Sequence, residues 1–211
     1  KSSLYSGYSV WRSILATNQK NIDFYLGSNF HIVTYPIDAN RSSFVAVIKT
    51  NKENNESWKQ KGNYDDLRAD LPPYILDKFT SLKQNTEIYK WGVFTRPILK
   101  ELCYKNVTFL GDAAHPIVPF MGQGACLAME DAYVFGNLIR KNNNFKKTQK
   151  EYQNIRFSRI KLIHNKSLNQ ARFNHLKNPI LVFIRNVLMK YTRIISSRTK
   201  AIWSYNVTKK L

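Results

Sequence analysis

The stretch "GDAAHPIVPFMGQGACLAMEDA", residues 111–132, decides how this chain folds. It follows the apolar run "NVTFL", crosses a loop with two prolines, and enters a long proline-free segment through a Gly-Gln-Gly triplet. This pattern predicts a short strand over residues 106–111 and a helix from 122 to about 139, because Ala, Met and Leu favour helices. Since apolar residues lie nearly all round this helix, we expect it to be buried.

A carboxylate and two glycines stand at opposite ends of this loop. Asp112 leaves the predicted strand at its carboxyl end, where ligands of α/β sheets usually bind, and a carboxylate accepts hydrogen bonds from sugar or polyol hydroxyls. Gly122 and Gly124 let the backbone approach a flat ligand, and the free N–H groups of a helix start favour negative charge. A dinucleotide fingerprint is not supported, because the third glycine is missing and no strand precedes the triplet.

The rest of the chain is a predicted sheet followed by helices. Four segments are rich in β-branched and aromatic residues, and we expect them to form an antiparallel meander: 8–15, 30–37, 44–50 and 88–95. Four further segments have helical patterns: 63–71, 72–82, a basic stretch over 147–172, and an amphipathic run from Pro179 to about 200.

The loop resembles the second flavin-binding motif of the FAD-dependent aromatic hydroxylases, flavoprotein monooxygenases such as salicylate hydroxylase and 3-hydroxybenzoate 6-hydroxylase. The resemblance implies that Asp112 holds the ribityl chain of FAD, that Pro119 flanks the isoalloxazine ring, and that backbone N–H groups at the helix start face the ring. The cofactor-binding residues implied are Gly111, Asp112, Pro119, Gly122, Gln123, Gly124 and Ala125. His115, inside the loop, is expected to orient the backbone.

The resemblance covers nearly the whole chain. "YSGYSVWRSIL" (5–15), "ESWKQKGNYDDLRADLPP" (56–73) and "AIWSYN" (201–206) are similar to further stretches of the family, with Ser9 and Ser13 where Ala and Gly are usual. The fold class implied is α+β or α/β: the carboxyl-terminal portion of a two-domain FAD-dependent hydroxylase. Its expected parts are a substrate-binding antiparallel sheet with short helices over 1–100, a flavin-contacting strand-loop-helix over 101–145, and a basic helical tail over 146–211.

Only the carboxyl-terminal half of the family is matched. Family members begin with a Gly-x-Gly-x-x-Gly unit for the ADP part of FAD and carry a second Asp-Gly motif, and neither occurs in this sequence. We therefore expect the chain to be a fragment, an isolated domain or one product of a split gene, with a separate amino-terminal FAD-binding half as a partner.

"HIVTYP" carries the candidate substrate contacts. His31, Val33 and Tyr35 alternate onto one face of a strand, with His31 and Tyr35 about 13 Å apart along it. From the residues alone, a hydrogen-bonded strand histidine and a core tyrosine are the favoured interpretation. The family resemblance implies instead that both line the aromatic pocket, so we predict that His31 and Tyr35 are catalytic and substrate-binding. Arg96 is predicted to meet a substrate carboxylate or the flavin edge, with a surface ion pair as the alternative.

The function implied by the resemblance is hydroxylation of a phenolic acid-like substrate. FAD is reduced by NADH or NADPH and reacts with O₂ to a flavin C4a-hydroperoxide, which transfers oxygen to the ring. One alternative is a hydroxylase of a quinone precursor or another lipophilic ring at a membrane. Another is an inactive remnant that acts as a basic binding module.

The charge is unevenly distributed along the chain. The formal net charge is +19, of which residues 1–135 carry +2 (15 basic, 13 acidic) and residues 136–211 carry +17 (18 basic, 1 acidic). Because the basic residues alternate with apolar ones at helical spacing, we interpret them as a solvated face; nucleic acid is not expected, and a membrane surface is the less favoured partner. The sequence has no long apolar segment, no apolar signal region and no cysteine–histidine cluster, so a cytoplasmic protein without a metal is expected.

Overall fold

The computed structural model describes residues 3–51, 57, 59–84 and 87–211. They form two compact units: residues 3–94 with 173–177, here called the sheet unit, and residues 95–172 with 178–211, here called the helical unit. The division predicted at residues 100 and 145 stays a prediction. Glu56 and Trp58, in one of the stretches that resemble the family, lie outside the described residues.

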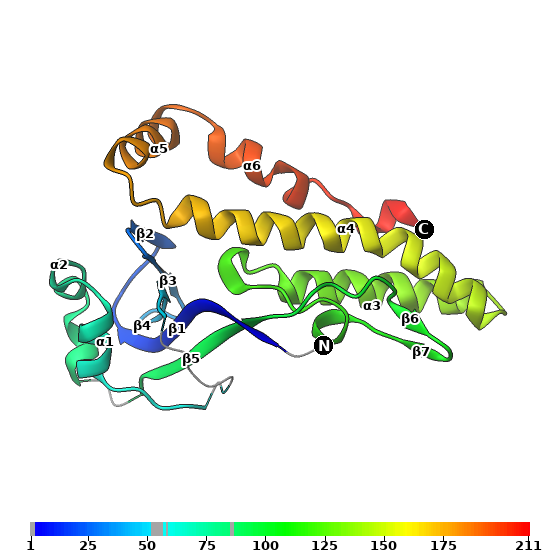
Figure 1. The fold of residues 1–211 in the computed structure, drawn as a ribbon, viewed down its shortest axis with the longest axis horizontal. Helices are drawn as coiled ribbons and strands as arrows, with labels where there is room; N and C mark the ends of the chain where they lie inside the picture. The colour runs from blue at the N-terminus through cyan, green and yellow to red at the C-terminus, as the bar shows by residue number, and fades with distance from the viewer. Residues whose placement is uncertain (1–2, 52–56, 58, 85–86) are drawn as a thin grey trace. The chain divides into compact units, whose positions relative to one another are not determined.

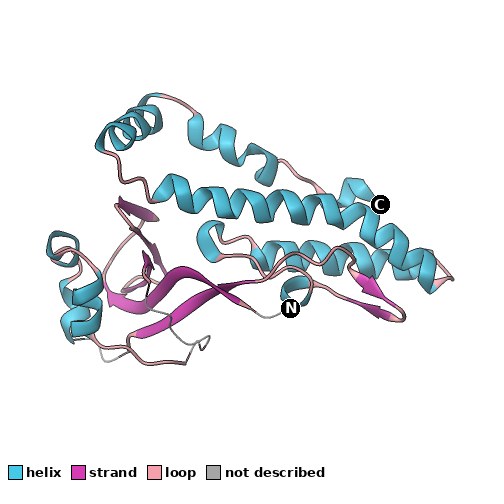
Figure 2. Ribbon diagram, in the orientation of Figure 1, coloured by secondary structure: helices cyan, strands magenta, loops and turns pink. Residues whose placement is uncertain are grey.

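The sheet unit contains a five-stranded sheet (Figures 1 and 2). Its strands are β1 (Leu4–Ala16), β2 (Asp23–Gly27), β3 (Phe30–Pro36), β4 (Arg41–Lys49) and β5 (Tyr89–Thr95), in the order β2-β3-β4-β1-β5. The four predicted strands are confirmed, but the meander is wrong, because β1 lies between β4 and β5. An unpredicted strand, β2, occupies the edge beside β3. The tight turn between them places Asn29 at φ 71°, a left-handed conformation that asparagine tolerates.

One face of this sheet is covered by short helices. Trp11, Ile32 and Phe44 are among the fully buried side chains of the core beneath α1 (Tyr64–Asp70), α2 (Pro73–Leu76) and η1 (Thr80–Gln84). The indole Nε1 of Trp11 donates to Asp70 Oδ2 at 3.0 Å, so this buried donor is satisfied. Because side chains alternate along a strand, the neighbours of these core residues point to the opposite face, and His31 and Tyr35 lie there.

The helical unit begins with the hairpin β6 (Cys103–Tyr104) and β7 (Val107–Thr108). The predicted strand 106–111 is therefore wrong in length, because Gly111, at φ 56°, already starts the turn η2 (Gly111–Ala113). After η3 (Pro119–Met121), Gly122 adopts φ 61°, a left-handed conformation that ends the turn, and α3 (Gly124–Lys141) begins two residues later than predicted.

Long helices make up the rest of this unit. They are α3, α4 (Phe145–Asn174), α5 (Pro179–Tyr191), α6 (Ile194–Trp203) and the short η4 (Val207–Lys210). α3 and α4 run side by side in Figure 1, and their buried apolar residues, such as Val134 and Ile160, form one cluster. Among the described helices, we find none that is both long and apolar enough to cross a membrane.

Two helical predictions need correction. The buried residues of α3 form a single stripe, while Met129, Tyr133 and Ile139 are exposed, so the prediction of all-round burial is wrong. The stripe packs against α4 and α6: Val134 and Leu138 cluster with residues of α4, and Leu127 clusters with Ile163 of α4 and Ile202 of α6. The amphipathic run from residue 179 breaks after Tyr191, because the β-branched Thr192 is extended and its hydroxyl oxygen accepts from the N–H of Ile194 at the start of α6.

Candidate functional site

The loop from Gly111 to Ala125 is held in place by a buried carboxylate on α3. Asp131 Oδ2 accepts from the N–H of Gly111 at 3.0 Å and lies 2.5 Å from Nε2 of His115, while Oδ1 accepts from Arg156 Nε at 2.7 Å. The three side chains of Asp131, His115 and Arg156 are almost completely buried. One carboxylate thus ties the start of the loop to α3 and α4.

A second carboxylate completes this cluster. Glu130 forms ion pairs with Arg156 at 2.8 Å and with Arg159 at 2.9 Å, and the guanidinium of Arg159 lies 4.1 Å from the ring centroid of Tyr205. Burial alone would raise the pKa of Asp131, but hydrogen bonds from His115, the Gly111 N–H and Arg156 outweigh it and lower that pKa. We call the set Asp131, His115, Arg156, Glu130 and Arg159 the charged cluster.

The backbone of the loop requires glycine at two points. A Cβ on Gly111 would lie 3.2 Å from the Cβ of Ala128, so the loop approaches α3 closely here, and φ is positive at both Gly111 and Gly122. A Cβ on Gly122 or Gly124 would meet no atom within 4 Å. The N-cap residue of α3, Gln123, makes no side-chain capping bond, so the first N–H groups of α3 have no side-chain cap.

The loop residues predicted to bind the cofactor differ in exposure. Asp112, Pro119, Gly122 and Ala125 are exposed, Gly124 is half-buried, and Gly111 and Gln123 are buried. Within the part of the chain that the structure describes, the carboxylate of Asp112 has no hydrogen-bond partner. Its oxygens can therefore accept hydrogen bonds from a ligand, whereas the oxygens of Asp131 already accept from groups of the protein.

On the sheet unit, His31 and Tyr35 occupy one face of β3. His31 is 3% exposed, and its Nδ1 lies 2.7 Å from Nε2 of His175, the residue after α4. Tyr35 is half-buried and pairs with Ser43 of β4. Arg96 follows β5, is half-buried, and has interactions of its own, so its role at a substrate stays a prediction.

A cavity of about 350 Å³ opens near Tyr35 on the sheet unit. It is lined by Arg12 and Ile14 of β1, Ser43 of β4, and Tyr89 and Trp91 of β5, among others. Ser43 is opposite Tyr35 and Ile14 in the sheet register, so its side chain shares their face. Its buried Oγ has no hydrogen-bond partner among the described residues. The cavity combines aromatic walls with the cation of Arg12, the carboxylate of Glu87 and one unsatisfied hydroxyl.

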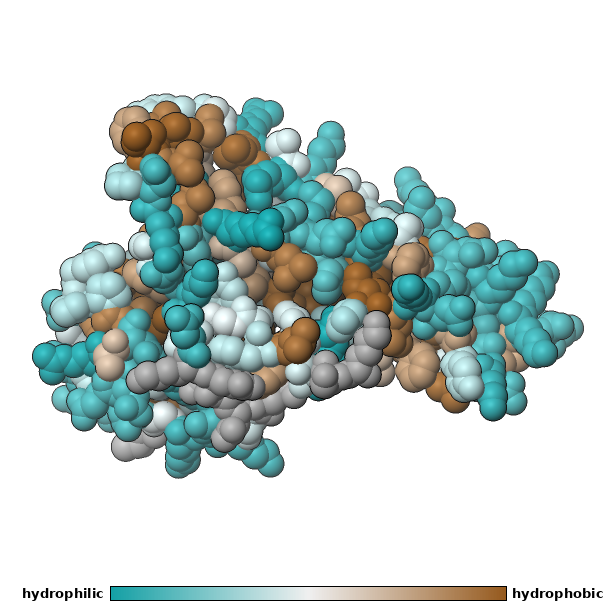
Figure 3. All heavy atoms as spheres, in the orientation of Figure 1, coloured by the Kyte–Doolittle hydropathy of each residue, from teal (hydrophilic) through white to brown (hydrophobic). Residues whose placement is uncertain are grey.

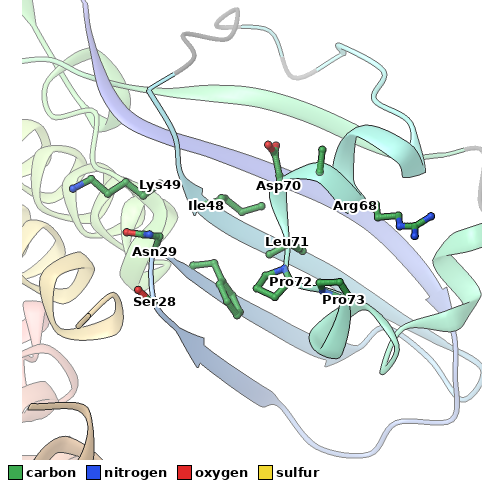
Figure 4. Close-up of a pocket in the computed structure, with 11 residues that line it drawn as sticks. Ser28, Asn29, Ile48, Lys49, Arg68, Asp70, Leu71, Pro72 and Pro73 are labelled. Atoms are coloured by element: carbon green, nitrogen blue, oxygen red, sulfur yellow. The ribbon is translucent and has the colours of Figure 1, made fainter. Parts of the chain in front are cut away.

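A second cavity of about 440 Å³ lies at the other edge of this unit (Figure 4). It is formed by the β2–β3 turn, the end of β4 and the residues that join α1 to α2, and it contains none of the predicted site residues. Figure 4 shows its two cationic side chains, Lys49 and Arg68, extending in opposite directions. Because these charges do not converge, we assign this cavity no ligand.

Comparison with known proteins identifies the family. Residues 8–144 match the model of the FAD binding domain. The chain belongs to this FAD binding domain family. Among curated relatives, the 3-hydroxybenzoate 6-hydroxylase of Polaromonas naphthalenivorans is 30% identical over 197 residues, which are 88% of this chain and 48% of the relative. The 3-amino-4-hydroxybenzoate 2-monooxygenase of Streptomyces platensis is 27% identical over 181 residues, 82% of this chain and 46% of the relative.

Solved structures share the fold. Klebsiella pneumoniae HpxO, complexed with FAD and uric acid, has a TM-score of 0.77 and 24% identity, with 96% of this chain and 54% of that chain covered. A salicylate hydroxylase substrate complex has a TM-score of 0.81 and 19% identity, covering 99% of this chain and 56% of that one. The family and the fold class predicted from the sequence are confirmed. The chain spans about half the length of the curated relatives that it matches.

The loop of this FAD-binding family member fits its cofactor. Asp112 is exposed and unpaired, the space beyond Gly122 and Gly124 is open, and the amides at the start of α3 have no side-chain cap. These features suit a ligand with hydroxyls at one end and a flat, electron-rich ring at the other. FAD has both. The assignment of individual residues to it stays a prediction.

Several residues of the sites were not found from the sequence. Asp131 and Arg156 hold the loop from outside it, and His175 meets His31 from 144 positions away. Arg12 and Trp91 line the cavity near Tyr35. Only the adjacent acidic pair Glu130-Asp131, inside an otherwise apolar helix, was a signal that could have been followed, because buried carboxylates need partners.

Proposed function

We propose that this chain is part of an FAD-dependent monooxygenase that hydroxylates a small aromatic ring, with NADH or NADPH and O₂ as co-substrates. The observation that carries the proposal is the loop from Gly111 to Ala125, which presents an unpaired carboxylate and uncapped amides while the charged cluster fixes its backbone. The family match and the aromatic substrates in the names of the relatives support it.

Each part of the chain has one task in this proposal. Asp112 accepts hydrogen bonds from the ribityl hydroxyls, and the N–H groups of residues 122–125 face the polar edge of the ring. Bound FAD would supply the redox chemistry that the family resemblance implies: two electrons would come from NADH or NADPH, one atom of O₂ would enter the ring, and the other would leave as water. His31 and Tyr35 contact the aromatic substrate, and Arg12 and Arg96 are the cations that could meet its carboxylate.

The cofactor assignment is tested by titrating FAD into the protein that contains this chain and following flavin fluorescence. Asp112→Ala removes hydrogen bonds to a charged acceptor and should weaken FAD binding about 10- to 100-fold. Gly124→Ala should also weaken it, because a methyl group enters the open space beside the ring. Glu101→Ala, which removes another exposed carboxylate of the helical unit, is the matched control. Unchanged affinity in Asp112→Ala would contradict the assignment.

A second candidate is a hydroxylase of a lipophilic ring that works at a membrane surface, and one observation favours it. The outer face of α5 is apolar, and Figure 3 shows it as a brown patch at the upper left. Its exposed residues are Ile180, Leu181, Phe183, Ile184, Val187, Leu188 and Tyr191. Arg185 instead faces inward and is buried, which lowers its pKa. Exposed Lys190 and Arg193 lie near the patch, and no acidic residue follows Glu151 in the sequence.

Vesicle sedimentation tests this candidate. A basic helix with an apolar face should bind vesicles that contain anionic lipid, and binding should weaken as salt is raised. Phe183→Ser should reduce sedimentation, whereas Leu162→Ser, an exposed apolar residue of α4, should leave it unchanged. Equal sedimentation with neutral vesicles, or a stable dimer in solution that protects the α5 face, would speak against a membrane role.

A further inference from the structure

The cavity near Tyr35 contains a cation and a hydroxyl that the protein itself does not use. Within the part of the chain that the structure describes, the guanidinium of Arg12 forms no ion pair and no hydrogen bond. Ser43 is 1% exposed, and its Oγ has no hydrogen-bond partner among the same residues. Because a buried hydroxyl without a partner costs free energy, this arrangement is typical of a site that a ligand completes.

Both groups lie on the sheet face opposite α1 and α2. Trp11 and Phe44 are buried in the core beneath these helices, so their chain neighbours Arg12 and Ser43 point to the other face. Arg12 lies opposite Val45 in the register, which makes Ser43 its diagonal neighbour on β4, at about 7–8 Å between the backbones. One small ligand can therefore contact both groups.

Aromatic rings from β5 form the wall beside Arg12. Lys90 donates to Asp70 and its Nζ lies 4.6 Å from the ring centroid of Trp11, so Lys90 faces the core. Its neighbours Tyr89 and Trp91 face the opposite way, and both line the cavity as half-buried side chains. Such a wall suits a flat ring that stacks on it or meets it edge to face.

The acidic residue of the cavity, Glu87, is engaged by the protein. Its carboxylate accepts from the hydroxyl of Tyr89 and lies 3.7 Å from Nζ of Lys61. Its backbone carbonyl accepts from Ser13 Oγ at 2.9 Å, which ties this wall to β1. Because Lys61 offsets the charge of Glu87, the cation of Arg12 gives the cavity a net positive charge, which favours an anionic ligand.

We propose that this cavity selects an aromatic acid as the substrate. The guanidinium of Arg12 binds the carboxylate through its two parallel N–H groups, and the hydroxyl of Ser43 donates to the same acidic group. Arg96 does not line the cavity and has interactions of its own, so Arg12 is the cation that determines specificity. The inference rests on the proposed function, because the bound ring has to be the one that is hydroxylated.

The sheet register gives the bound acid a direction. Ser43 lies opposite Tyr35 of β3, and Arg12 is on β1, two strands away from Tyr35. Neighbouring strands are about 4.8 Å apart, so a ring held at Arg12 extends across β4 toward Tyr35. Anchoring the acidic group at one end thus orients the ring, and neutral lipophilic rings lack the group that is anchored.

The inference is tested by calorimetric titration of the FAD-loaded protein that contains this chain. Two probes of similar shape are compared, the anion 3-hydroxybenzoate and the neutral 3-hydroxybenzamide, and the anion should bind more tightly. Arg12→Gln should weaken binding of the anion about 10- to 100-fold, the range for a hydrogen bond to a charged group, and leave binding of the amide unchanged. Arg12→Lys should recover only part of the loss, because an ammonium keeps the charge but not the planar fork. Arg68→Gln, at an exposed arginine of α1, is the matched control.

Ser43→Ala separates ligand binding from folding. Removing a hydroxyl that has no partner in the chain should leave the melting temperature of the protein unchanged. Binding of 3-hydroxybenzoate should weaken about 3- to 10-fold, as expected for the loss of one hydrogen bond. A lower melting temperature together with unchanged binding would show that the hydroxyl serves the fold, and Ser43 would then have no part in the site.

The outcomes distinguish a failure of this inference from a failure of the proposed function. If Arg12→Gln weakens both probes equally, or if Arg96→Gln removes the preference for the anion instead, the assignment of Arg12 is overturned while the hydroxylase function stands. If the protein binds and hydroxylates only the neutral probe, the substrate class is wrong. If FAD binds but neither aromatic probe does, the substrate part of the proposed function fails, and this inference fails with it.

Discussion

The charged cluster of the helical unit and the pair of His31 and His175 in the sheet unit, here called the histidine pair, solve the same problem in opposite ways. Each buries titratable side chains from segments far apart in the sequence. In the charged cluster, the carboxylates of Asp131 and Glu130 form ion pairs with the guanidinium groups of Arg156 and Arg159. In the pair, burial keeps both imidazoles neutral. One region compensates buried charge, and the other avoids it.

The two solutions suit two tasks. Ionised groups with several hydrogen bonds each hold a backbone firmly, and the N–H of Gly111 is one of the groups held. The neutral pair has one hydrogen bond between its two rings, so it holds the backbone less firmly than the ion pairs do. His115 and His175 show the difference: each has an unpartnered, buried Nδ1 among the described atoms, yet Nε2 of His115 is bonded to a carboxylate and Nε2 of His175 to an imidazole.

The largest expected effect comes from breaking the charged cluster. Asp131→Ala leaves Arg156 buried without its closest partner and should lower the free energy of unfolding by about 3–5 kcal/mol, measured by urea denaturation. Asp112→Ala, at the exposed carboxylate of the same loop, should change it by less than about 0.5 kcal/mol. If the free energy of unfolding fell by a similar amount in the two variants, the charged cluster would not be what stabilises the loop.

The second effect separates the two regions by pH. The unfolded chain binds protons at its histidines near the ordinary pKa of 6.5, whereas folded His31 and His175 bind them only near about 3 and 4. Stability should therefore be complete above pH 6.5 and fall by about 2 kcal/mol per histidine between pH 7 and pH 5. The pKa of Asp131 is lowered from 3.8 in the folded chain. The stability that its ionised form contributes is therefore lost only as the pH falls below that value.

Urea denaturation at several pH values measures this difference. In Asp131→Ala the loss between pH 7 and pH 5 should persist, because the histidine pair is intact. In a variant with both His31 and His175 replaced by leucine, most of this pH-dependent loss of stability should disappear. A flat stability between pH 7 and pH 5 in the unaltered chain would show that the pair is not held neutral by burial.

The sequence predicted the parts of this molecule that depend on neighbouring residues. Strands β1, β3, β4 and β5 follow from β-branched and aromatic runs, and the helix after the Gly-Gln-Gly triplet follows from composition. The position of Asp112 at the start of the loop needed only its local context. The strand order was missed, because β2 is five residues long and pairing partners are not written in the local pattern.

The partners in both buried clusters could not be predicted for the same physical reason. Arg156 and Arg159 lie in a long, mostly polar helix whose sequence does not distinguish a buried arginine from an exposed one. His175 follows the end of that helix in the polar run "NHLKN", which reads as a loop. Their burial depends on which segments meet in three dimensions. A single sequence therefore predicts which loop residues face a ligand, a prediction that still stands as one, but it did not indicate the residues that hold the loop.

The smallest effect tests what keeps the histidine pair neutral. Tyr8→Leu removes the ring beside His175 and should lower the free energy of unfolding by about 0.5–1.5 kcal/mol. Because burial is the larger cause of the low pKa of His175, opening this wall should raise that pKa toward 6.5, which proton NMR of the ring can follow. If the pKa stays near about 4, the charge of Lys49 and not burial keeps His175 neutral, and Lys49→Met should then raise it instead.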